Sequence, residues 1–196
     1  MSQPENERRQ EFLISMYNQT WNNINRHINV IWQPIGVLIA ALGLLSFGEK
    51  NIINFDVATA LIILFCGWFI AHVYDSSHWF NRNLIIITNI EKQFLNDRDE
   101  KEIHYFFKKP FPEKEMMITH FRLQRMLGQG IIIVVLFYHF ITRFDNVNTP
   151  LTLGSLLIFL PYLTLIGVLN YLKTHIDSIN SKYQELIKKS PGKESE

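Results

Sequence analysis

The stretch NQTWNNINRHINVIWQPIGVLIAALGLL, from Asn18 to Leu45, decides the fold. Its first third is rich in asparagine, and its last half is apolar enough to lie in a lipid bilayer. A single proline, Pro34, stands between the two parts, and proline is more frequent in membrane helices than in soluble ones. The stretch therefore predicts one long helix that begins outside the membrane and continues into it.

Four segments are apolar enough to cross a membrane, which takes about 20 mostly apolar residues. They are residues 28–47, 57–74, 127–142 and 151–172. A soluble four-helix bundle is the alternative, but each of its helices would show a polar face along its length, and these segments show almost none. We therefore expect an all-α fold, a four-transmembrane-helix bundle in contact with the lipid bilayer.

Lysine and arginine indicate the orientation, because they concentrate in loops on the cytoplasmic side. The two turns, residues 48–56 and 143–150, hold only Lys50 and Arg143. The other basic residues lie in the N-terminal segment, the central segment and the tail. Both termini and the central segment are therefore predicted to be cytoplasmic.

Helical spacing of apolar residues continues beyond the spans, as in Leu84, Ile87, Ile90 and Phe94, which indicates helices that project into the cytoplasm. Prolines at 110 and 112 disfavour helix in the central segment. The predicted organisation has four parts: a first helical hairpin with cytoplasmic extensions at 1–97, a cytoplasmic connecting loop at 98–118, a second hairpin with a cytoplasmic tail helix at 119–190, and a disordered tail at 191–196.

Two stripes at spacings of three and four follow the first helix. The first is made of amides and then small residues: Asn18, Asn22, Asn25, Asn29, Gln33, Gly36, Ala40, Gly43 and Ser46. The second is bulky and apolar: Tyr17, Trp21, Ile24, Ile28, Ile31, Ile35, Leu38, Leu42 and Leu45. Amides at membrane depth are costly unless they meet partners or water. The first stripe is therefore expected to face protein or a water path.

Two interpretations of the first stripe stay open. Small residues allow membrane helices to pack closely, and amides can hydrogen-bond across such a contact. Alternatively, several copies place the stripe around a common axis, where uncharged amides wet a pore near the cytoplasm and small residues line it further out. The predicted pore-lining residues are Asn22, Asn25, Asn29, Gln33, Gly36, Ala40 and Gly43.

A polar cluster lies where the first two spans leave the membrane. Its members are Arg26, His27, His72, Asp75, His78 and Arg82. We expect Asp75 to pair with Arg26, or else with Arg82. Histidine and carboxylate are suitable metal ligands, and histidine titrates near neutral pH. Interfacial polar packing is the favoured interpretation, and no metal site is predicted.

A third group of basic residues lies in the central segment and at the start of the third span. Its members are Lys108, Lys109, Lys114, Arg122 and Arg125. Arginine at the cytoplasmic end of a span anchors to lipid headgroups. The competing interpretation is a site for an acidic ligand, such as a phosphate, nucleotide or oligonucleotide.

The chain shows no signature of an enzyme: there is no serine elbow, glycine-rich phosphate loop or zinc motif, and no cofactor is predicted. Secondary transporters have more spans and helices broken at mid-membrane. Two classes fit better. One is a homo-oligomer, such as a tetramer, that forms a gated ion-conducting pore. The other is a membrane-anchored sensor or scaffold that recruits or regulates a soluble cytoplasmic partner.

The segments WNNINRHINVIWQPIGVLI (21–39) and HVYDSSHWFNRNLIIITNIEKQF (72–94) resemble small bacterial four-span membrane proteins. In size, span count and cytoplasmic helix extensions the chain also resembles the membrane effectors of bacterial anti-phage defence. The first resemblance is to the channel component of Hailong-type systems, and the second is to the membrane component of Kiwa-type systems. The first implies an oligomeric multi-pass channel of the bacterial inner membrane that stays closed until infection and then depolarises it. The second implies a membrane sensor coupled to a soluble DNA-binding partner.

Overall fold

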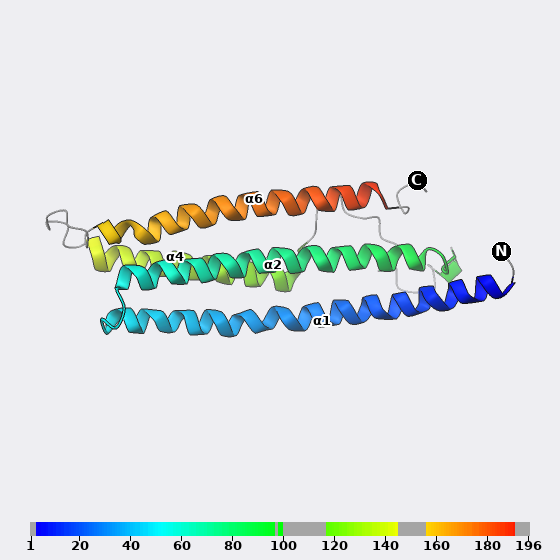
Figure 1. The fold of residues 1–196 in the computed structure, drawn as a ribbon, viewed down its shortest axis with the longest axis horizontal. Helices are drawn as coiled ribbons and strands as arrows, with labels where there is room; N and C mark the ends of the chain where they lie inside the picture. The colour runs from blue at the N-terminus through cyan, green and yellow to red at the C-terminus, as the bar shows by residue number, and fades with distance from the viewer. Residues whose placement is uncertain (1–2, 97, 100–116, 145–155, 191–196) are drawn as a thin grey trace. The chain divides into compact units, whose positions relative to one another are not determined.

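The computed structural model describes residues 3–96, 98–99, 117–144 and 156–190. They form four long helices, α1 (Gln3–Glu49), α2 (Phe55–Glu91), α4 (Thr119–Phe144) and α6 (Leu160–Lys188), with a short 3-10 helix η1 (Leu157–Phe159) before α6 (Figure 1). No strand occurs in these ranges, so the all-α prediction is confirmed. All four helices are long and apolar enough to cross a membrane, as expected of a multi-pass membrane protein.

The predicted continuous first helix is confirmed, because α1 passes through Pro34 without a break. After α1 ends, Asn51 takes a left-handed backbone conformation with φ of 55°, which asparagine tolerates better than most residues. The side chain of Asn54 then caps α2, since its Oδ1 accepts hydrogen bonds from the N–H groups of Asp56 (2.9 Å) and Val57 (3.2 Å). These two asparagines make a tight turn between α1 and α2.

The chain divides into two compact units. Unit 1 holds residues 1–30, 76–116 and 179–196, and unit 2 holds residues 31–75 and 117–178. Helices α1, α2 and α6 contribute segments to both units, whereas α4 belongs to unit 2 alone. Most of the predicted connecting loop, and the predicted tail at 191–196, lie outside the described residues.

In unit 2, α2 is the central helix. A Cβ added at Gly67 would lie 2.5 Å from Val168 of α6, and one added at Gly128 of α4 would lie 3.0 Å from Ile70. Glycine thus lets both neighbours approach α2 closely, as in other membrane bundles. The most apolar window of α2 is 61% buried, against 19%, 22% and 17% for α1, α4 and α6. The other three helices therefore present most of their apolar surface outward.

Unit 1 has its own small core between α2 and α6. Ile85, Tyr183 and Ile187 pack together there, and Asn89 is hydrogen-bonded to Ser190 at 3.0 Å. The predicted apolar spacing of α2 beyond its span is confirmed at Ile87 and Ile90, which are buried. It fails at Phe94, which is 42% exposed because α2 ends at Glu91.

Candidate functional site

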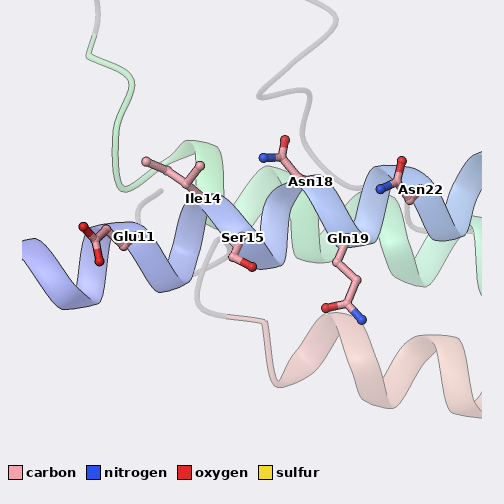
Figure 2. A pocket seen from close by; sticks show the side chains of 6 residues that line it. All are labelled: Glu11, Ile14, Ser15, Asn18, Gln19 and Asn22. Atoms are coloured by element: carbon pink, nitrogen blue, oxygen red, sulfur yellow. The ribbon is translucent and has the colours of Figure 1, made fainter.

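The amide part of the predicted stripe faces away from the core of unit 1. Asn18, Asn22, Asn25 and Asn29 are all exposed, while Ile24 on the opposite side of α1 is 2% exposed. Figure 2 shows that the side chains at the beginning of this face all come from α1. They line a shallow hollow of about 550 Å³: Glu11, Ile14, Ser15, Asn18, Gln19 and Asn22.

The small-residue part of the stripe is equally unpartnered in unit 2. The exposed residues there are Gln33, Gly36, Ala40, Gly43 and Ser46. A Cβ added at Gly36 or Gly43 would meet no neighbouring atom within 4 Å among the described residues. Leu38, on the opposite side of α1, is 3% exposed. We call the two exposed parts together the outward face of α1.

Exposure of the outward face is compatible with both interpretations of the stripe, because another copy of the chain could pack against it or share a pore with it. Close packing of its small residues against another helix of the same chain is not found in the described residues. All seven predicted pore-lining residues lie on this face and are exposed. Among the described residues, no other segment covers this face.

The predicted polar cluster is distributed among several separate contacts. In unit 1, His27 stacks on Trp79 with ring centroids 6.2 Å apart. The guanidinium of Arg82 lies 4.8 Å from the centroid of the same Trp79 ring, a cation–π distance. Trp79 thus gathers two of the predicted residues, while Arg26 is exposed.

In unit 2, His72 stacks on Trp68 at 5.7 Å, and Asp75 Oδ1 lies 3.2 Å from Nε2 of His175 on α6. His175 was not among the predicted partners of this carboxylate. The predicted pairs of Asp75 with Arg26 or Arg82 would join residues of different units, and they stay predictions.

The predicted contacts for an acidic ligand are described only in part. Arg125 donates a hydrogen bond to the hydroxyl of Tyr74 at 3.1 Å, and Arg122 is exposed at the start of α4. Lys108, Lys109 and Lys114 lie outside the described residues. The described part of the chain holds no group of three or more His, Cys, Asp or Glu residues suited to a metal ion.

A buried ionic network in unit 2 was not predicted. Asp56, in the first turn of α2, and His139 of α4 are both 0% exposed, and His139 Nε2 lies 2.9 Å from Asp56 Oδ1. Arg143 binds the same carboxylate in a bidentate manner, through Nε at 2.9 Å and Nη2 at 3.0 Å. The remaining ring nitrogen of His139 lies 3.3 Å from the hydroxyl of Tyr162 on α6. We call these four residues the Asp56 network.

Both ring nitrogens of His139 and both oxygens of Asp56 have partners when His139 is neutral. Its Nε2–H donates to the carboxylate, and its Nδ1 accepts from the Tyr162 hydroxyl. Phe55 stacks on the histidine ring with centroids 5.7 Å apart. The carboxylate also lies at the N-terminus of α2, where the helix dipole favours negative charge. The network therefore holds α2, α4 and α6 together at one end of unit 2.

A signal for this network exists in the sequence. His139 and Arg143 are four residues apart and therefore share one face of a helix. Asp56 immediately precedes the second apolar segment, and the hairpin topology brings that position level with the end of the third. An ionisable residue inside a membrane span is a functional candidate by default.

Comparison of the chain with protein-family models, curated proteins and solved structures finds no match.

Proposed function

We propose that this protein assembles as a homo-oligomer, such as a tetramer, in the bacterial inner membrane and forms a gated ion-conducting pore. The outward face of α1 would surround the common axis. The observation that carries the proposal is that all seven predicted pore-lining residues, from Asn22 to Gly43, are exposed among the described residues.

The outward face of α1 is more stable in contact with water or with another protein chain than in contact with lipid. Transfer of an amide side chain from water to an apolar environment without a hydrogen bond costs about 1–3 kcal/mol, as estimated from mutations in proteins. Asn29 and Gln33 lie at the start of the first predicted span, so each copy would incur this cost if the face met lipid. Around a shared axis the amides keep water, while Gly36 and Gly43 allow helices of neighbouring copies to approach closely.

The proposed topology places both termini and the central segment in the cytoplasm. The amides of α1 then line the cytoplasmic half of the pore, and the small residues line the outer half. In the role implied by the resemblance to anti-phage effectors, the pore stays closed until infection and then depolarises the membrane. The testable consequence is that protection against phage and ion conduction depend on the same residues.

The test is ion flux through purified protein in liposomes, measured with a potential-sensitive dye. Asn29→Leu and Gln33→Leu are each expected to reduce the flux by roughly 5- to 150-fold, because loss of an amide removes about 1–3 kcal/mol of ion or water stabilisation. Asn170→Leu is the matched control, since Asn170 is an exposed amide on α6. Flux through all three variants that equals a measurable wild-type flux would refute a pore lined by α1.

A second function is favoured by exposed apolar side chains near the N-terminal end of α1. Phe12 and Ile14 are 67% and 53% exposed in unit 1, and Ile14 lines the hollow shown in Figure 2. Such side chains suit a membrane-anchored sensor or scaffold that recruits or regulates a soluble cytoplasmic protein. Assembled oligomers that conduct no ions would favour this function over the pore.

A further inference from the structure

Glu91, the last residue of α2, is a buried carboxylate in unit 1. It is 7% exposed, and the hydroxyl of Tyr17 on α1 donates a hydrogen bond to its Oε1 at 3.0 Å. Its Oε2 is buried and has no hydrogen-bond partner within the described residues. Buried polar atoms almost always have a partner. The site therefore holds a carboxylate that is only half satisfied when ionised.

Two features of this position disfavour the charged form. Burial raises the pKa of Glu91 above its ordinary value, and the hydrogen bond from Tyr17 offsets part of that rise. The carboxylate also sits at the C-terminus of α2, where the helix dipole is negative. The pKa of Tyr17 is raised as well, chiefly by burial, so the tyrosine remains a neutral donor.

Other charged and titratable groups lie on the elements around this end of α2. They are Arg9 and Tyr17 on α1, Lys92 immediately after α2, Glu185 and Lys188 on α6, and Lys189 immediately after α6. The guanidinium of Arg9 donates to Gln93 Oε1 at 3.2 Å. Lys189 pairs with Glu185, one turn before it on α6. Burial, which raises the pKa of Glu91, therefore outweighs the hydrogen bond from Tyr17, which lowers it.

We propose that Glu91 is a proton-responsive contact between α1 and α2, which binds a proton as the pH falls and thereby stabilises unit 1. The direction follows from linkage between proton binding and folding. A carboxyl that holds its proton more tightly in the folded chain stabilises the fold fully below the ordinary value of 4.5. That stabilisation is lost as the pH rises through the higher value of the folded chain. Proton binding by Glu91 affects the folding of the chain and does not depend on the proposed pore.

The test is thermal unfolding of the full-length protein in detergent between pH 4.5 and pH 8. Glu91→Gln keeps an acceptor for Tyr17 but cannot ionise. We expect its melting temperature to match the wild type at pH 4.5 and to exceed it at pH 8. Glu185→Gln is the control, because Lys189 lowers the pKa of that exposed carboxyl. This variant is expected to be no more stable than the wild type at pH 8.

A second variant keeps the test decisive if Glu91→Gln does not fold. Tyr17→Phe removes the donor to the ionised carboxylate, so we expect a larger loss of melting temperature at pH 8 than at pH 4.5. Parallel pH profiles for Glu91→Gln and wild type would overturn the proposal. An equal loss for Tyr17→Phe at both pH values would overturn it too, because the tyrosine would then contribute through packing alone.

Discussion

Removal of the Asp56 carboxylate tests whether the Asp56 network holds the helices of unit 2 together. Asp56→Ala leaves the ring N–H of His139 without an acceptor in a fully buried site, which costs about 1–3 kcal/mol. Arg143 is 35% exposed and can turn toward solvent, so its share is discounted to about 1 kcal/mol. The sum is about 2–4 kcal/mol of lost stability.

The assay is thermal unfolding of the full-length protein in detergent. At roughly 2–4 °C per kcal/mol for a protein of this size, the melting temperature should fall by roughly 5–15 °C. Glu49→Gln is the control, because Glu49 accepts a hydrogen bond from Tyr138 at 2.7 Å in an exposed pair and should contribute under about 1 kcal/mol. A variant Asp56→Ala that melts within about 2 °C of the wild type would refute the reasoning.

Two further changes probe helix contacts and caps. Gly67→Ala places a methyl group 2.5 Å from Val168 Cγ1 and should destabilise the protein by about 1–3 kcal/mol. In the control Gly130→Ala, the added methyl group meets no neighbouring atom within 4 Å among the described residues. This variant should be as stable as the wild type or more stable by about 0.5–1 kcal/mol. Similar melting temperatures for Gly67→Ala and Gly130→Ala would contradict the α2–α6 contact. Asn54→Ala removes the N-cap of α2 and should cost about 1 kcal/mol, a loss that an unchanged denaturation midpoint would exclude.

The long helices could be predicted because their signals are local. A run of about 20 apolar residues identifies a span, and spacings of three and four identify which side of α1 turns outward. Ile24 and Leu38 belong to the predicted apolar stripe and are buried, whereas the amide stripe beside them is exposed. Periodicity within one helix was therefore sufficient to predict that Ile24 and Leu38 are buried and that the amides are exposed, although Leu42 of the apolar stripe is 40% exposed.

Contacts between helices could not be predicted in the same way. Arg143 is 87 residues from Asp56, and its charge was interpreted only as evidence of orientation. Tyr17 is 74 residues from Glu91, and neither residue is unusual in its own segment. Pairing at such separations depends on the rotation and axial shift of each helix. Those quantities follow from the packing of the whole bundle, including the close approach at Gly67.

The most direct test of the central claim is block of ion flux by a water-soluble charged thiol reagent. Asn29→Cys would be introduced together with Cys66→Ala, since Cys66 is the single, buried native cysteine. A pore lined by the outward face of α1 predicts that the reagent stops flux through the Asn29→Cys protein and leaves the matched Asn170→Cys protein unaffected. Flux that persists through fully labelled Asn29→Cys would contradict the claim, because a charged adduct there could not lie in the conducting path.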